Sequence, residues 1–234
     1  MCIRDSYYAV SDYTKVNPEF GTLEDFKALV QKAHELGIYV ILDWVPGHTG
    51  WDHRWIQEKS EYYLKNRKGE IISPIDSRTG KSFGWTDVAD LNYNNLDMRE
   101  ELRQAMIYWV KETDIDGYRI DQAYAIPPAF YDKTFKALRE IKPLFLLAET
   151  DIYHPGGIDL VRKFDASYDW SGFQISKQVA QGRSSVLDYH RHIQRTNRLY
   201  EPENILINFI SINAENSWNG TIKENFGAAN HAFM

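Results

Sequence analysis

Apolar residues recur every three or four positions in some segments and form short continuous runs in others. The first pattern predicts an amphipathic helix, and the second predicts a buried parallel strand. Helical spacing between Thr22 and Gly37 predicts a helix, with Thr22 as N-cap and Asp25 as its capping-box partner. The apolar run over residues 38–46 then predicts a strand that carries Asp43 near its end.

This alternation continues to the end of the chain, and it implies a parallel sheet with crossover helices. Residues 47–95 interrupt this alternation, because they contain no long periodic run. Within them the sequence predicts a short helix over 55–66 and a turn at Ser77–Gly80. The further predicted helices cover residues 97–110 (capped by Asp97), 129–141, 174–181 and 184–200. The further predicted strands cover residues 117–121, 144–149, 164–169 and 204–210.

Three of the predicted strands end in a carboxylate: Asp43, Asp121 and Glu149. A doubly wound sheet collects such groups at a switch point, whereas a (β/α)8 barrel collects them in a ring. Acids on three successive strands favour the barrel. The expected fold class is therefore α/β, a (β/α)8 TIM barrel.

Arg119 lies two residues before Asp121, so both side chains point to one face of the predicted strand. The cation would hold the carboxylate ionised, although a purely structural ion pair fits the same pattern. Converging acids suit either glycoside transfer or a divalent-metal site, and His48 could serve in both or be an ordinary loop residue. The arginine argues against a metal at Asp121, and the apolar neighbours of Glu149 suit a general acid.

Composition narrows the functional classes. A net charge of −6 argues against nucleic acid as the main partner, and no apolar run is long enough to predict a membrane span. The 14% aromatic content suits either a site that stacks sugar rings or an aromatic core. Cys2 is the single cysteine, so no intrachain disulfide forms. Met1–Ser6 has no apolar signal core, and the true N-terminus is expected to be missing. Localisation therefore stays open, with the periplasm and the extracellular space as candidates.

Five segments resemble the α-amylase superfamily, glycoside hydrolase family 13, and they follow one another along the chain in the family's order. Asp43-Trp-Val-Pro-Gly-His48, Gly117-Tyr-Arg-Ile-Asp121 and Leu147-Ala-Glu149 resemble its first three conserved regions. Asn208-Phe-Ile-Ser-Ile-Asn213-Ala214 stands where the fourth belongs. Val88-Ala-Asp-Leu-Asn92 is similar to the motif that closes the family's inserted B subdomain.

The resemblance implies a retaining mechanism on the α-glucosidic bonds of a glucan or oligosaccharide. Asp121 would be the nucleophile, Glu149 the general acid and then the base, and Arg119 the group that holds Asp121 ionised. The residues that would shape the adjoining sugar subsite are Asp43, His48 and Tyr8.

The chain departs from the family pattern at its fourth region. The family has Asn-His-Asp there, and the aspartate is the third catalytic acid, whereas this chain has Ile212, Asn213 and Ala214. Glu215 does not replace the acid, because a shift of one residue turns a strand side chain to the opposite face. This departure keeps a second hypothesis open, a non-catalytic relative that binds glucan or a protein partner.

Gly47 stands where many members have a calcium-binding asparagine. Asp90 is a candidate ligand, so calcium stays open as a cofactor although Gly47 weakens the case for it, and the sequence indicates no other cofactor. Two further alternatives stay open, a transglycosidase of the same mechanism and a carboxylate-metal barrel hydrolase.

The expected domain organisation is an incomplete barrel. Residues 7–234 form a partial catalytic domain that includes a B-subdomain-like excursion over 47–95, inserted after the third barrel strand, and residues 1–6 are foreign to it or disordered. The first strand, most of the second and the eighth are expected to be missing. An open barrel exposes sheet edges, so we expect this chain alone to be inactive.

Overall fold

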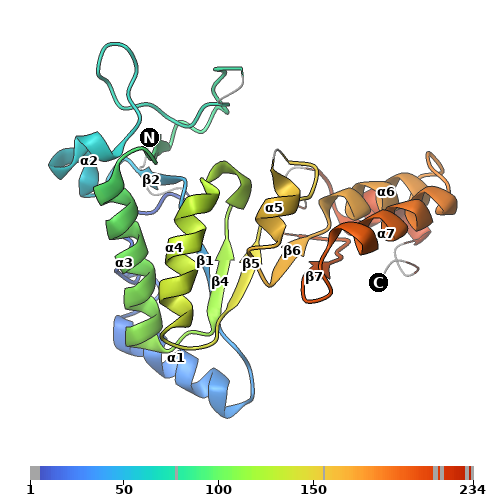
Figure 1. The fold of residues 1–234 in the computed structure, drawn as a ribbon, viewed down its shortest axis with the longest axis horizontal. Coiled ribbons are helices and arrows are strands. Elements are labelled where there is room, and N and C mark those ends of the chain that lie inside the picture. Colours follow the sequence, from blue (N-terminus) through green and yellow to red (C-terminus); the bar gives the residue numbers. More distant parts are fainter. Residues whose placement is uncertain are drawn as a thin grey trace. The chain divides into compact units, whose positions relative to one another are not determined.

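The computed structural model describes residues 6–76, 79–154, 156–212, 216, 219–229 and 232 (Figure 1). The chain divides into two compact units, Met1–Phe145 and Leu146–Met234. Each unit contains parallel strands followed by helices, as the alternating pattern predicts.

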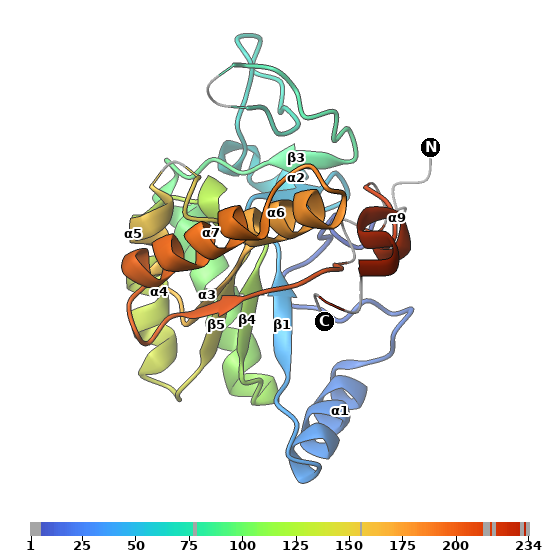
Figure 2. The same ribbon diagram turned by 90° about the vertical axis from the view of Figure 1, so that its right-hand side faces the viewer.

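The first unit is built on the parallel pair β1 (Ile41–Trp44) and β4 (Gly117–Ile120), in which Asp43 is the partner of Arg119 (Figure 2). Helices α3 (Leu96–Thr113) and α4 (Pro128–Arg139) lie side by side against it (Figure 1). The other elements of this unit are α1 (Leu23–Glu35), β2 (His48–Gly50), α2 (Trp55–Glu58), η1 (Ser60–Tyr62), β3 (Val88–Asp90) and η2 (Ala123–Ala125).

Capping residues fix where the helices of this unit begin. The predicted capping box of α1 is confirmed, since the Thr22 side chain accepts from Asp25 N and the Asp25 carboxylate accepts from Thr22 N. The prediction that Asp97 caps α3 is wrong. Asn95 is the N-cap and its side chain accepts from Met98 N, which places Asp97 inside the first turn.

Buried aromatic and aliphatic side chains tie α3 and α4 to the strands. Tyr118 of β4 is fully buried and its hydroxyl donates to Met106 O at 2.7 Å. Tyr131 of α4 donates in the same way to Ala123 O at 2.9 Å. Both hydroxyls therefore satisfy a backbone carbonyl while their rings remain in the core.

The excursion over 47–95 lies beyond the carboxyl ends of β1 and β4 (Figure 2). Its strands β2 and β3 form an antiparallel pair that begins with His48 opposite Asp90. The predicted helix over 55–66 is too long, because the non-helical backbone at Lys59 (φ −144°, ψ 54°) separates α2 from η1. Of the predicted turn at 77–80, Ser77 and Arg78 lie outside the described residues.

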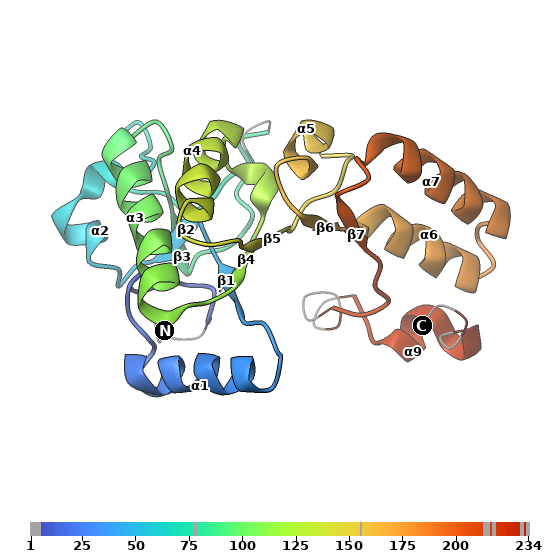
Figure 3. The same cartoon turned by 60° about the horizontal axis from the view of Figure 1, so that its bottom comes forward.

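The second unit contains parallel strands. They are β5 (Phe145–Ala148), apart from its first residue, β6 (Ala166–Tyr168) and β7 (Ile205–Ile207). Helices α6 (Trp170–Ala180) and α7 (Val186–Leu199) lie side by side (Figure 3). The sequence predicted α6 only from Gln174, whereas the Asp169 side chain accepts from Gly172 N and starts the helix at Trp170. In the described part of this unit, three short helices were not predicted: α5 (Gly157–Val161), α9 (Ile222–Phe226) and η3 (Gly227–Ala229).

Within the described ranges, no helix combines the length and apolar character that crossing a membrane requires.

Candidate active site

Arg119 joins two carboxylates at the carboxyl ends of β1 and β4. Its Nη1 donates to Asp43 Oδ1 at 2.8 Å and to Asp121 Oδ1 at 2.6 Å. The strand register brings Asp43 opposite Arg119, and the two-residue period of β4 brings Asp121 to the same face. The side chains of Arg119 and Asp121 are only 11% and 12% exposed, whereas Asp43 is 45% exposed. One cation therefore orients both acids, and Asp43 is the more accessible of them.

Asp43 is also held from its other oxygen. The hydroxyl of Tyr8, in the loop that precedes α1, donates to Asp43 Oδ2 at 2.8 Å. The structure thus brings four of the predicted site residues into one hydrogen-bonded chain, which runs from Tyr8 through Asp43 and Arg119 to Asp121.

A backbone hydrogen bond fixes the position of Asp121, in addition to the contact that its side chain makes with Arg119. Asp121 N donates to Trp44 O at 2.8 Å, which extends the parallel ladder one residue beyond β4. The next residue, Gln122, has a left-handed backbone (φ 43°, ψ 47°) that turns the chain away into η2. Asp121 is therefore the last residue that the sheet aligns before the chain turns.

His48 opens β2 and is buried beside the carboxylates, with 7% of its surface exposed. Burial lowers the pKa of His48, although the charges of Asp121 and Asp87 act in the opposite direction. The imidazole is thus neutral at pH 7 and within electrostatic reach of Asp121. The ring of Trp85 lies edge-on to it, with a centroid separation of 6.1 Å.

Tyr13, which the sequence did not single out, holds the loop that carries His48. Its hydroxyl contacts Val45 O at 2.9 Å and His48 O at 3.0 Å, and its ring is buried. No sequence motif points to Tyr13, because its two partners are more than 30 residues away.

Glu149 follows β5 directly in the second unit and is partly buried. Asn213, Ala214 and Glu215, which carry the predicted departure in the fourth region, lie outside the described residues.

The residues around Asp90 do not fit a calcium ion. Burial raises the pKa of Asp90 to about 6, although the backbone hydrogen bond with Leu91 acts in the opposite direction. Gly47 offers no side-chain ligand, and in the parts of the chain that the structure describes no three His, Cys, Asp or Glu side chains gather as a metal site would require. We therefore assign no calcium role to Asp90.

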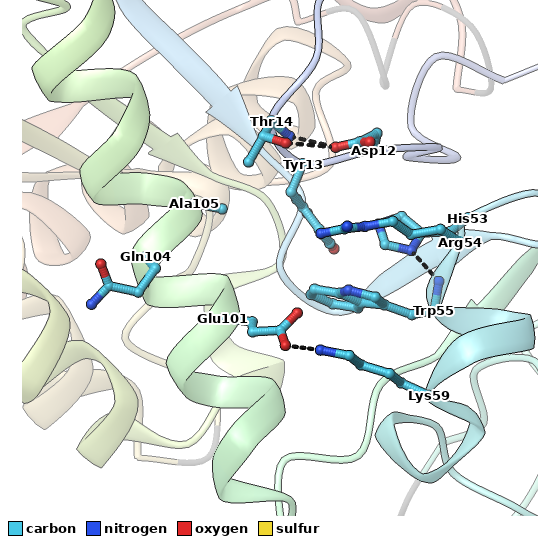
Figure 4. Close-up of a pocket in the computed structure, with 10 residues that line it drawn as sticks. All are labelled: Asp12, Tyr13, Thr14, His53, Arg54, Trp55, Lys59, Glu101, Gln104 and Ala105. Carbon is cyan, nitrogen blue, oxygen red and sulfur yellow. Dashed lines mark hydrogen bonds and ion pairs between the residues drawn. The ribbon is translucent and has the colours of Figure 1, made fainter.

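A separate cavity of about 420 Å³ lies between the segment that contains Tyr13, helix α2 and helix α3 (Figure 4). Lys59 pairs with Glu101 at its edge, and His53 Nδ1 accepts from Trp55 N at 3.1 Å within its wall. None of the residues predicted for the active site lines this cavity.

Residues 3–142 match the family model described as alpha amylase, catalytic domain. The chain belongs to this family. The α-amylase match covers β1, the excursion, β4 and the Tyr8–Asp43–Arg119–Asp121 chain of hydrogen bonds.

Two curated proteins illustrate what the chain is similar to. Alpha-amylase 3 of Dictyoglomus thermophilum is 33% identical over 162 residues, which is 61% of this chain and 32% of that protein. The amino acid transporter heavy chain SLC3A1 of Homo sapiens is 25% identical over 232 residues, 85% of this chain and 33% of that protein. The chain thus spans about a third of the length of these curated relatives.

Among solved structures, the noncanonic maltogenic alpha-amylase AmyB of Thermotoga neapolitana matches with a TM-score of 0.75 and 31% identity. The match covers 87% of this chain and 45% of that one. The predicted fold class is confirmed, an incomplete (β/α)8 barrel that carries a small antiparallel sheet as expected for a B-subdomain insertion.

Proposed function

We propose that the full-length protein is a retaining α-glucan hydrolase of the α-amylase type. The observation that carries this proposal is the single guanidinium nitrogen that Arg119 shares between Asp43 and Asp121. It fixes the direction of one Asp121 oxygen and places a cation beside the carboxylate, which is the arrangement that a carboxylate nucleophile requires.

In the proposed mechanism, an oxygen of Asp121 attacks the anomeric carbon while the glycosidic C–O bond breaks. Glu149 gives its proton to the departing oxygen, so the leaving sugar departs neutral and a glycosyl ester forms on Asp121. Glu149 then removes a proton from water, the water oxygen attacks the same carbon, and Asp121 is released as a carboxylate. Two inversions retain the α configuration.

Asp43 is suited to bind the sugar on which Asp121 acts. It is more exposed than Asp121, yet both its oxygens are already oriented, one by Tyr8 and one by Arg119. A carboxylate held in this way accepts hydrogen bonds from sugar hydroxyls without having to reorganise. The buried His48, which lies within electrostatic reach of Asp121, adds a further hydrogen-bonding side chain to the site.

The proposal is tested by replacing the nucleophile in the full-length protein. Asp121→Asn should abolish turnover of maltooligosaccharides, and the parent protein treated with an activated fluoroglucoside should gain one glycosyl group on the peptide that contains Asp121. Mass spectrometry of that peptide decides the assignment. A label on another residue, or no label with no turnover, would refute it.

Asp116→Asn is the matched control. Asp116 precedes β4 at its opposite end and is equally buried, with a side chain 13% exposed against 12% for Asp121. Its partners are Lys142, His34 and the backbone N–H of Val40. The control should lower stability while the turnover number stays near that of the parent protein.

A second candidate is a family member that binds without catalysis. Two observations favour it, the alanine at position 214 and the similarity to a transporter heavy chain over 85% of this chain. The double substitution Asn213→His with Ala214→Asp separates the two. A non-catalytic protein should gain nothing from it, whereas an enzyme weakened at this position should gain activity by orders of magnitude.

A transglycosidase would form the same ester on Asp121 and pass it to a sugar instead of to water. Chromatography of the products from a single maltooligosaccharide distinguishes the two, because transfer gives chains longer than the substrate.

A further inference from the structure

The chain turns sharply at Glu149, the residue proposed as the general acid. Pairing of β5 with β6 ends at Ala148, which is fully buried and lies opposite Ser167. Thr150 N then donates to Ala148 O at 3.0 Å, so Glu149 is the central residue of a tight three-residue turn. The ladder with β6 stops one residue short of Glu149, and the direction of its side chain depends on how the following residues are held.

Asp151, two residues after Glu149, is a carboxylate that accepts hydrogen bonds on both of its oxygens. It is only 5% exposed. Its Oδ2 accepts from both Ser171 N and Ser171 Oγ at 2.9 Å, which ties it to the first turn of α6. Its Oδ1 accepts from Tyr153 N, also at 2.9 Å, the bond of an Asx-turn. One buried side chain therefore shapes its own loop and fastens that loop to a helix.

The backbone around Asp151 is held as firmly as its carboxylate. Asp151 N donates to His154 Nδ1 at 3.1 Å, and His154 N donates to Asp151 O, also at 3.1 Å. Gly157 packs against the same peptide, because a Cβ on it would lie 2.4 Å from Asp151 O. Thr150 has no exposed surface. Residues 150 and 151 therefore form a stiff link between Glu149 and α6.

The first turn of α6, which carries Ser171, is itself anchored to the sheet. Asp169 N donates to Ile207 O at 2.9 Å, next to the parallel pair of β6 and β7. The Asp169 side chain accepts from Gly172 N at 2.8 Å, and His192 Nε2 of α7 lies 2.9 Å from both of its oxygens. The link to Ser171 thus joins the turn after β5 to a helix end whose position the sheet already fixes.

A proton donor depends on its position, because a general acid has to lie within about 2.6–3.2 Å of the atom that it protonates. We infer that Asp151 is a positioning residue, which holds the turn at Glu149 so that the Glu149 carboxyl reaches the glycosidic oxygen. This inference rests on the proposed function, in which Glu149 protonates the leaving sugar. In this role Asp151 acts only through Glu149 and contacts no reacting atom.

The test compares two substrates whose leaving groups differ in their need for a proton. The leaving oxygen of a maltooligosaccharide takes the proton of Glu149, whereas the fluoride of α-maltosyl fluoride departs as an anion with the bonding electron pair. For both substrates kcat/KM covers the steps up to the ester on Asp121, before Glu149 acts as a base. A misplaced acid therefore lowers kcat/KM for the oligosaccharide alone, which a general defect in the fold would not do.

Asp151→Ala in the full-length protein should lower kcat/KM for the maltooligosaccharide by about 10²-fold, the cost of moving a catalytic group by roughly 1 Å. The value for the fluoride should stay within about twofold, because that step needs no acid. Retained activity on the fluoride shows in the same assay that the variant is folded. Equal losses on the two substrates, or no loss on the oligosaccharide, would overturn the inference.

Ser171→Ala tests the same link from the helix side. It removes the hydroxyl that donates to Asp151 and keeps the backbone N–H, so the fold is disturbed less. It should lower kcat/KM for the oligosaccharide by about tenfold and leave the value for the fluoride unchanged. A Ser171→Ala protein with parent values on both substrates would contradict a role of this link in catalysis.

Asp165→Ala is the matched control. The Asp165 carboxylate also ties β5 down, since it accepts from Leu146 N at 2.8 Å, but it does so near the start of the strand. Its loss should lower the midpoint of thermal unfolding and leave kcat/KM for both substrates near the parent values. A selective loss on the oligosaccharide in this variant would show that any weakening of β5 has the effect assigned to Asp151.

The parent protein separates this inference from the proposed function. If it turns over both substrates while Asp151→Ala loses activity equally on both, Asp151 is purely structural and the proposed function stands. If the parent protein turns over neither substrate and gains no glycosyl group on Asp121, the proposed function fails and the inference about Asp151 fails with it.

Discussion

Asp43 and Arg119 face each other across the parallel pair of β1 and β4, and a 2.8 Å hydrogen bond joins Asp43 Oδ1 to Arg119 Nη1. The same nitrogen donates to Asp121, so the register of β1 against β4 decides how both carboxylates are oriented. A slip of one residue between β1 and β4 would turn the Asp43 side chain to the other face of the sheet and break this link.

Arg119→Met should reduce kcat/KM of the full-length protein on maltooligosaccharides by roughly 10²–10³, the range found when one preorganised donor is removed from an active site. Arg119→Lys should recover part of the loss, because it restores the charge but not the planar fork. Steady-state kinetics measures both variants.

Lys142→Met is the control for the arginine series. Lys142 also links two carboxylates, Asp114 and Asp116, but at the opposite end of β4. It should cost stability and leave kcat/KM unchanged. Equal activity losses in the two series would show that Arg119 acts only on the fold.

Gly117→Ala should destabilise the first unit by about 3 kcal/mol or more, the upper part of the range for forcing an extra group into a packed core. A Cβ at this position would lie 1.8 Å from Phe145 O, so the backbone itself would have to move. Urea unfolding followed by circular dichroism measures the change.

Gly47→Ala is the control for the close backbone approach at Gly117, because a Cβ at position 47 meets no atom within 4 Å. Its free energy of unfolding should stay within about 0.5 kcal/mol of the parent value. Similar losses at positions 47 and 117 would contradict the role of close backbone approach.

His53 should make the protein less stable in mild acid. Burial lowers its pKa from 6.5 to about 4, so the folded protein resists protonation of this ring while the unfolded chain does not. The stabilisation that the neutral His53 ring contributes to the free energy of unfolding is fully present above pH 6.5. It is lost as the pH falls toward 4, by on the order of 3 kcal/mol.

The free energy of unfolding of a His53→Gln variant, measured from pH 7 to pH 4, should fall less steeply than that of the parent protein. The titration of the His53 ring protons by NMR provides a readout that does not depend on the variant's folding. A midpoint near 6.5 would show that the ring is not desolvated.

Asn95→Ala should cost about 1 kcal/mol, the usual cost of losing an N-cap. Its side chain accepts from Met98 N at 3.0 Å at the start of α3. Asp97→Asn should cost less, because in the first turn it contributes only a charge near the helix dipole. Thermal unfolding of both variants decides which residue caps the helix.

The sequence alone determined the features that depend on neighbours along the chain. Helical and strand periods placed α1, α4 and α7 and the strands within a few residues, and the capping box at Thr22 was correct because its partner is three residues away. The common face of Arg119 and Asp121 follows from the two-residue period of a strand. The ordered motifs indicated the family.

Only the tertiary structure decided what depends on how distant segments meet. Three contacts of the site join residues at least 30 positions apart. They are the register of Asp43 with Arg119, the hydrogen bond from Tyr8 to Asp43, and the hydrogen bond from Tyr13 to Val45. The link between the loop after β5 and α6 needs Asp151 to meet Ser171. No local periodicity encodes such contacts, because they arise when buried strands and helices settle into one shared packing.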